Sequence, residues 1–177
     1  MKLLIVVDMQ NDFIDGALGS PEAQAIVPNV KKKIAEYIGN GDAVVFTRDT
    51  HGSNYLETQE GKNLPVHHCI KGTNGWEIKD ELVFGGANIV DKVTFGYDSW
   101  VDYLSYFDIV NINEVDSIEI IGLCTDICVI SNAMIIKAQF YETPIYVDAN
   151  CCAGVTPESH KNALEAMKMC QINIIGE

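Results

Sequence analysis

The sequence predicts an α/β protein with a doubly wound, mostly parallel sheet of six strands and helices on both faces. Short apolar runs alternate with longer segments in which apolar residues recur every three or four positions, as on one side of a helix. The apolar runs lack the strict alternation of half-exposed strands, which is typical of parallel strands buried on both faces. No repeat, low-complexity tract or linker interrupts this pattern, so we expect a single domain over residues 1–177.

The first predicted strand, residues 2–7, is a nearly continuous apolar run. A helical pattern follows over residues 21–38; it begins at a proline, which favours the first helical turn, and Gly39 and Gly41 end it. Residues 43–47 form the second predicted strand. These elements make up the first strand, helix and strand of the alternating pattern.

A polar stretch of roughly residues 49–80 separates the second strand from the third, residues 87–92. Connections of this length are uncommon in compact domains unless they carry a function. The stretch is therefore a candidate functional loop. A short helix is predicted after the third strand, over residues 99–111.

The second half of the chain continues the alternation. The predicted elements are strand 117–123, helix 126–141, strand 144–147, helix 157–169 and strand 172–175. In doubly wound folds, ligands bind beyond the carboxyl ends of the strands. Functional side chains are therefore expected in the segments that follow the strands.

The composition argues against several classes of partner. Twelve Lys and Arg against 25 Asp and Glu give a formal net charge of −13, whereas nucleic-acid binding needs a basic surface. No segment reaches the roughly 20 apolar residues of a membrane span, and the chain begins with no signal-peptide pattern, so we expect no membrane partner and a cytoplasmic location. The six cysteines lack CxxC spacing and are expected to be free thiols, with the adjacent Cys151 and Cys152 packed in the core.

Three chemically distinct side chains follow three of the strands. Asp8 ends the first strand, Lys92 ends the third, and Cys128 follows the fourth. Each alone has an ordinary structural interpretation: a turn residue, a solvated lysine and a core thiol. Together at one sheet edge they match a proton shuttle, a cation and a nucleophile for hydrolysis of an amide or ester.

The position of Cys128 predicts an activated thiol. It lies where an apolar strand turns into a helix, so its sulfur is expected to feel unpaired backbone N–H groups and the positive end of the helix dipole. Both effects lower the pKa of a cysteine and favour the thiolate. The same N–H groups are placed to stabilise an oxyanion.

The loop after the second strand contains residues typical of a metal site. Asp49 and His51 begin it, and Glu57, Glu60 and His68 follow. Imidazole and carboxylate groups ligate divalent transition ions such as zinc, manganese and iron. The spacing matches no strict zinc motif, so a polar loop with hydrogen-bonded histidines remains an alternative.

Several separated motifs occur in an order that resembles the isochorismatase-like cysteine hydrolases, in particular their nicotinamidase-like branch. The motifs are Val7-Asp8-Met9-Gln10-Asn11-Asp12-Phe13, Asp49-Thr50-His51, His68-Cys69-Ile70-Lys71-Gly72-Thr73, Lys92, and Gly122-Leu123-Cys124-Thr125-Asp126-Ile127-Cys128-Val129. The resemblance covers nearly all of the chain. It is more specific for the family than for the substrate.

The resemblance implies roles for the residues at the strand ends. Cys128 matches the family nucleophile, Asp8 its general base and acid, and Lys92 the third member of the triad. The peptide bond between Leu123 and Cys124 matches a cis bond of the family. The backbone N–H groups of Cys124 and Cys128 are then expected to form the oxyanion hole.

The resemblance also implies one divalent transition metal, with zinc first and manganese or iron as alternatives. Asp49, His51 and His68 match metal-ligating positions of nicotinamidases. Glu60 is preferred to Glu57 as a further ligand, on similarity to members that use a glutamate there.

The ring-binding residues match less well. Phe13 matches a ring-packing position of the family, whereas Leu64 replaces an aromatic residue that stacks on the substrate. Phe95 and Trp100 could supply the missing wall, although each is equally compatible with the core.

The function implied is hydrolysis of a small amide, with nicotinamide converted to nicotinate and ammonia through a thioester, in a homo-oligomer. One alternative is a related amidase that acts on a carbamoyl or ureido compound without a metal. From another class, a flavodoxin-like binding protein would need a Gly-, Ser- or Thr-rich loop after the first strand, where residues 8–13 are acidic and bulky.

Overall fold

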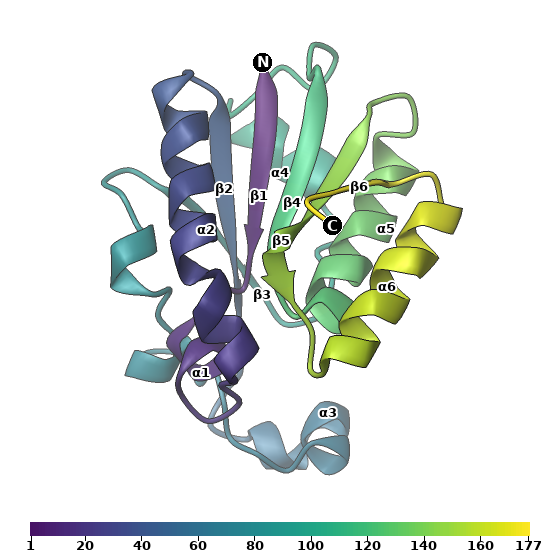
Figure 1. Ribbon diagram of the computed structural model, residues 1–177. Helices are drawn as coiled ribbons and strands as arrows, with labels where there is room; N and C mark the ends of the chain where they lie inside the picture. Colours follow the sequence, from purple (N-terminus) through teal and green to yellow (C-terminus); the bar gives the residue numbers. More distant parts are fainter.

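The core of the protein is a six-stranded sheet of order β3-β2-β1-β4-β5-β6 (Figure 1). The computed structural model describes all 177 residues. The strands are β1 (Lys2–Val7), β2 (Ala43–Asp49), β3 (Asn88–Lys92), β4 (Ser117–Leu123), β5 (Ile145–Ala153) and β6 (Asn173–Ile175). Every neighbouring pair is parallel. The predicted fold class is confirmed, and the sheet is parallel throughout.

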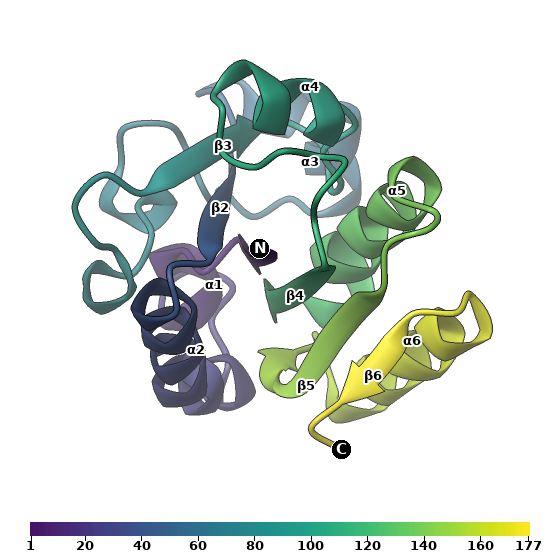
Figure 2. The ribbon, with the colours of Figure 1, turned by 90° about the horizontal axis from the view of Figure 1, so that it is seen from above.

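Helices cover both faces of the sheet (Figure 2). The long helix α2 (Pro21–Gly39) lies on one face, while α4 (Trp100–Tyr106), α5 (Ile130–Gln139) and α6 (Pro157–Met169) lie on the other. The remaining helical turns lie in the connections: α1 (Asn11–Ile14), η1 (Tyr55–Glu57), α3 (Gln59–Asn63), η2 (Asn74–Trp76), η3 (Asp80–Leu82) and the π-helical turn η4 (Thr125–Val129). None of the helices is long and apolar enough to cross a membrane.

Local sequence signals explain where the two longest helices begin. The Ser20 side chain accepts a hydrogen bond of 3.0 Å from Ala23 N, and Pro21 occupies the first turn of α2. In α6, Thr156 and Ser159 form a reciprocal capping box. Both helices thus start where a side-chain oxygen satisfies the first free N–H groups.

A buried group of charges fixes α2 over the sheet. Lys33 of α2 lies 2.8 Å from Glu119 of β4 and 2.9 Å from Asp148 of β5. The Tyr37 hydroxyl donates a hydrogen bond of 2.7 Å to Glu119. Because an unpaired charge is costly to bury, these contacts specify how α2 sits on β4 and β5.

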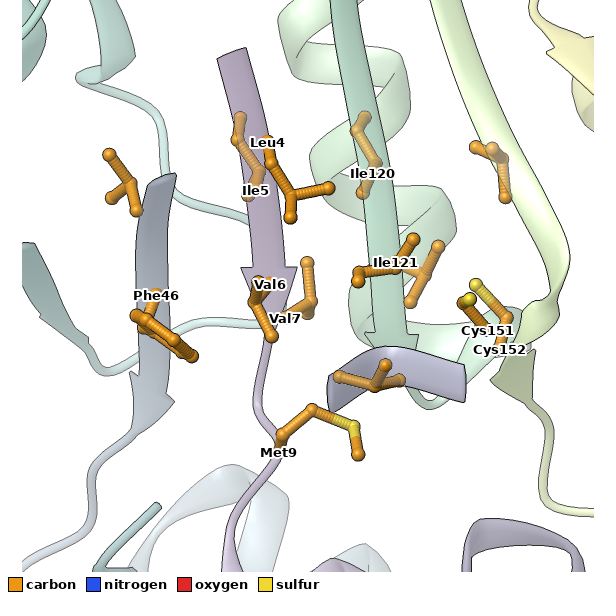
Figure 3. Packing of buried hydrophobic residues seen from close by; sticks show 14 of the residues in the cluster. Leu4, Ile5, Val6, Val7, Met9, Phe46, Ile120, Ile121, Cys151 and Cys152 are labelled. Carbon is orange, nitrogen blue, oxygen red and sulfur yellow. The ribbon is translucent and has the colours of Figure 1, made fainter. Parts of the chain in front are cut away.

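The central strands supply most of the core. Leu4, Ile5, Val6 and Val7 of β1 are almost completely buried, and Figure 3 shows them packed beside Phe46, Ile120 and Ile121. Since β1 is covered on both faces, its continuous apolar run has a direct structural cause. Cys151 and Cys152 are buried free thiols in the same cluster, as predicted.

Several element boundaries differ from the sequence prediction; for example, β2 runs to Asp49, and the helix expected over 126–141 is divided into η4 and α5. Strand β5 runs to Ala153, well beyond the predicted end, and its pairing with β4 resumes after a shift of register. The helix expected over 99–111 ends at Tyr106, because Asp108 adopts a positive φ of 51°. The predicted functional loop, residues 49–80, contains three short helical turns, η1, α3 and η2.

Gly122 brings β1 and β4 into unusually close contact. Its φ is +121°, and a Cβ at this position would lie 2.1 Å from the carbonyl oxygen of Val7. Val7 and Gly122 are paired in the sheet, one residue before Asp8. Only glycine satisfies both the backbone conformation and the lack of space.

We therefore predict that Gly122→Ala destabilises the fold by about 3 kcal/mol or more, because it combines a strained φ with overpacking. The measurement is urea unfolding. Gly39→Ala is the control, since its Cβ would meet nothing within 4 Å, and it should leave stability unchanged or raise it by about 0.4–1 kcal/mol. Equal unfolding free energies for the two variants would contradict this account.

Candidate active site

A pocket of about 1090 Å³ opens beyond the carboxyl ends of the strands. The loops after β1, β2, β3, β4 and β5 all contribute to its wall; examples are Phe13, His51, Phe95, Cys128 and Val155. This is the edge at which a doubly wound sheet is expected to bind ligands. A smaller cavity of about 410 Å³ lies at the other end of the sheet, near Met1 and Ala43.

Asp8, Lys92 and Cys128 meet next to this pocket, as the sequence predicted for their positions. Lys92 Nζ lies 2.6 Å from Asp8 Oδ2 and 3.7 Å from Cys128 Sγ. The side chains of Asp8 and Lys92 are both 0% exposed. Asp8 follows β1 with a φ of 48°, a left-handed conformation that aspartate tolerates better than most residues.

The Asp8 and Lys92 side chains perturb each other's pKa. Burial raises the pKa of the Asp8 carboxyl, and the lysine charge only partly offsets this. Burial alone would lower the pKa of Lys92, but Asp8, then Cys128 and Asp49, hold it above its usual range. Lys92 is therefore a stable cation, while Asp8 is a stronger base than an exposed carboxylate.

The expected low pKa of Cys128 is wrong. Burial raises the pKa of its thiol well above the usual range, Asp8 raises it further, and Lys92 lowers it only in part. Cys128 also sits in the π-helical turn η4, ahead of α5, and is 4% exposed. The resting group is a neutral thiol, so a nucleophilic role requires a neighbouring base.

Thr47 is a contributor that the sequence analysis missed. Its hydroxyl donates a hydrogen bond of 2.6 Å to Asp8 Oδ1 and accepts one of 3.2 Å from Asp8 N. The hydrogen bond to the carboxylate favours the ionised form of Asp8 and so lowers its pKa. Thr47 lies inside β2, where a threonine is an ordinary strand residue, and nothing in the sequence marks it.

Asp49, His51, Glu60 and His68 form a second group in the same pocket. One ligand atom from each lies within 4.8 Å of the others. Cys69 O accepts from His51 N, and His51 O accepts from Lys71 N, so the two ends of the long loop pair beside the histidines. This pairing brings together residues that the sequence separates by up to 19 positions.

The geometry of this group fits a divalent transition ion. The Nδ1–H of His68 donates to Val66 O at 2.8 Å, which leaves Nε2 free as a ligand. His51 Nε2 is buried without a hydrogen bond of acceptable geometry, although Asp49 Oδ2 is only 2.8 Å away. A buried imidazole nitrogen facing a carboxylate oxygen without a proper hydrogen bond is the arrangement that a shared cation would complete.

The two carboxylates of the group have opposite pKa shifts. Burial opposes ionisation of Asp49, but His51, His68 and Lys92 hold its pKa well below the usual range. The pKa of Glu60 is raised by burial and by the charge of Asp49. A bound cation would relieve the repulsion between them.

Glu60, and not Glu57, belongs to this group. Glu60 Oε1 lies 3.6 Å from His51 Nε2 and 3.8 Å from His68 Nε2. Glu57 is exposed and lies outside the group. His67, the sequence neighbour of His68, is exposed and lies outside it as well. The choice of Glu60 as a metal ligand stays a prediction, and the position of its carboxylate supports it.

Three further supports of the site were not predicted. The Gln10 side chain bonds both the N–H and the carbonyl of Asp49, at 2.7 and 2.8 Å. Tyr55 packs against His51 and His68, with ring centroids 4.6 and 4.9 Å away. Asn132 Nδ2 donates to the carbonyl of Cys128 at 2.8 Å. All three residues are buried, and the partners named here lie between 4 and 39 positions away in the sequence.

The residues expected to contact a substrate ring line the pocket unevenly. Phe13 is half-buried beside His68, with ring centroids 5.5 Å apart. Phe95 and Leu64 also line the pocket but stand at its exposed mouth. Trp100 is fully buried in the core and supplies no wall. The peptide bond between Leu123 and Cys124 is cis, as predicted.

Comparison with known proteins gives a consistent relationship. The family model described as Isochorismatase domain matches residues 2–176. A nicotinamidase of Saccharomyces cerevisiae is 28% identical over all of both chains. A zinc complex of pyrazinamidase from Pyrococcus horikoshii has a TM-score of 0.83 and 30% identity, covering 99% of each chain. N-carbamoylsarcosine amidase from Thermoplasma acidophilum has a TM-score of 0.78 and 26% identity, covering 98% of this chain and 95% of that one.

We predict that each chain binds about one divalent transition ion through the group of four ligands. Glu60→Ala should weaken binding of zinc by roughly 100-fold, because it removes one of these ligands. Competition with a chelating dye measures the affinity. Glu57→Ala is the matched control and should bind zinc as the wild type does; equal losses in both variants would exclude the assignment of Glu60.

Proposed function

The chain belongs to the isochorismatase family, and from this premise we propose that it is a nicotinamidase that converts nicotinamide into nicotinate and ammonia. Hydrolysis of an amide C–N bond follows from the family and from its nicotinamidase relatives. The observation that carries the finer proposal is that a thiol and a four-ligand metal group line one pocket, with the base of the thiol buried next to it. Lys92 joins the two, 3.7 Å from Cys128 Sγ and 3.8 Å from Asp49 Oδ1.

In the proposed mechanism, Asp8 first removes the proton from Cys128. The raised pKa of its buried carboxyl makes Asp8 a suitable acceptor for a thiol proton. Lys92 then stabilises the thiolate, because its ammonium group lies 3.7 Å from the sulfur. The thiolate attacks the amide carbonyl of the substrate.

The backbone N–H groups of Cys124 and Cys128 are proposed to stabilise the resulting oxyanion. Asp8 returns its proton to the departing ammonia, which leaves a thioester on Cys128. A water molecule, deprotonated by Asp8, hydrolyses the thioester to the acid. The sulfur leaves as a thiolate beside Lys92 and takes up a proton to restore the resting thiol.

Asp49, His51, Glu60 and His68 are proposed to hold a divalent transition ion, with zinc first. The ion would supply an electrophilic centre for the pyridine nitrogen and so orient the ring. Phe13 packs against His68 and is placed to contact the same ring.

The alternative carbamoyl or ureido substrate is less well supported. Many such compounds carry a carboxylate, which needs a cationic partner when it is buried. None of the 24 residues that line the pocket is Lys or Arg. A neutral amide therefore fits the pocket better.

Ammonia release from nicotinamide tests the proposal. Cys128→Ala should lower kcat by about four orders of magnitude, because it removes the sulfur that forms the proposed thioester. The control is Cys170→Ala, which removes an exposed thiol and should keep full activity. Full activity in the Cys128 variant, or no release of ammonia by the wild type, would refute the proposal.

The hydroxyl of Thr47 yields a pH prediction. It favours ionised Asp8, so Thr47→Val should raise the pKa of Asp8 further and keep this base protonated up to a higher pH. The acid limb of kcat/KM should move up by about one to two pH units, since a hydrogen bond to a charged group contributes about 1.5–3 kcal/mol. Thr47→Ser keeps the hydroxyl and should restore the wild-type limb. An unchanged limb in Thr47→Val would mean that Asp8 is not the base.

A further inference from the structure

The pocket is far larger than a single-ring amide requires. Its volume of about 1090 Å³ slightly exceeds the roughly 300–1,000 Å³ typical of pockets for drug-sized ligands. Asp49, His68 and Cys128 are nearly completely buried and form its inner end. A ring held there leaves the outer part of the pocket unfilled.

The outer part is lined by exposed apolar side chains. Leu64, Val93, Phe95 and Val155 are 37%, 74%, 45% and 60% exposed, respectively, and all line the pocket. They come from the segments after α3, β3 and β5, so no single hydrophobic stretch of sequence accounts for them. We call these four residues the apolar rim. Burying their surface under a ligand would be favourable.

The outer part of the pocket offers no cationic partner to an anionic substituent. No Lys or Arg lines any part of the pocket, and its two carboxylates, Asp49 and Glu60, belong to the proposed metal group. The polar side chains of the outer part are neutral: Ser20, Thr58, Gln59, Asn63 and Thr94. A substituent that reaches the rim therefore meets apolar carbon and neutral polar groups.

We propose that this protein hydrolyses aromatic amides that carry a neutral apolar substituent of several carbon atoms, and that the apolar rim binds this substituent. The inference rests on the proposed amidase function and specifies its substrate class. Val93 is the strongest determinant, because it is the most exposed residue of the rim and directly follows Lys92.

A matched series of nicotinamides tests the inference on the zinc-loaded protein. A butyl group, or a carboxypropyl group of similar length, is placed on the ring carbon adjacent to neither the amide-bearing carbon nor the nitrogen. Ammonia release gives kcat/KM, and calorimetry with Cys128→Ala gives affinity without turnover. The butyl compound should bind about tenfold more tightly than nicotinamide, and the carboxypropyl compound about tenfold more weakly, where tenfold corresponds to about 1.4 kcal/mol.

Two valine variants separate the rim from exposed apolar surface in general. Val93→Asp should lower the ratio of kcat/KM for the butyl compound to that for nicotinamide by about tenfold. Val83→Asp is the control, because Val83 is 41% exposed but lies outside the pocket, and it should leave this ratio unchanged. Val93→Ile keeps an apolar side chain in the rim and should also leave this ratio unchanged.

The outcomes distinguish this inference from the proposed function. Hydrolysis of nicotinamide with rejection of the butyl compound would overturn the inference alone. Hydrolysis of the butyl compound without that of nicotinamide would overturn the proposed substrate and support the rim. An altered sedimentation coefficient of Val93→Asp with an unchanged substrate ratio would assign the rim to contacts between copies of the chain and overturn the inference.

Discussion

The buried ion pair between Asp8 and Lys92 is the interaction on which the rest of the site depends. Both side chains are withdrawn completely from water, and removing one partner of such a pair typically costs about 3–5 kcal/mol. The pair reaches across β2, because Asp8 follows β1 and Lys92 ends β3. The register of three adjacent strands must therefore be correct before either charge is satisfied. Thr47, in the strand between them, donates a further hydrogen bond to the Asp8 carboxylate.

The same lysine connects two chemically different centres. Lys92 contacts Asp8 and Cys128 on one side and Asp49 of the metal group on the other. Because Asp49 also faces both histidines, the charge in the metal group is felt at the thiol through short contacts. The proposed nucleophile and the proposed metal ligands are thus parts of one electrostatic unit. The neutral outer pocket adds shape and apolar surface to it, and no further charge.

Sequence patterns predicted the fold and the positions of the main site residues, because both depend on short-range signals. Apolar runs mark the strands, and the residues after them share one sheet edge in any parallel arrangement. The supports of the site were missed, because Thr47 and Gln10 each act through a partner 39 residues away, and Asn132 also accepts a hydrogen bond from Tyr97 N, 35 residues away. The direction of the Cys128 pKa shift was also missed, since burial decides it and burial depends on the complete fold. Helix ends were wrong where a positive φ, as at Asp108, stops the helix without a glycine.

The central position of β1 affects how the chain can assemble. Lys2–Val7 pairs with β2 on one side and, across more than a hundred residues of sequence, with Ser117–Gly122 on the other. When only the first half of the chain has left the ribosome, β4 is not yet available. One edge of the apolar strand β1 is then unpaired. Non-local parallel pairings of this kind fold slowly and leave such edges open to association. Because Cys128 follows β4, the chemical centre is completed by the same late step that covers this edge. Chains that stop before this point lack the thiol as well as the partner strand.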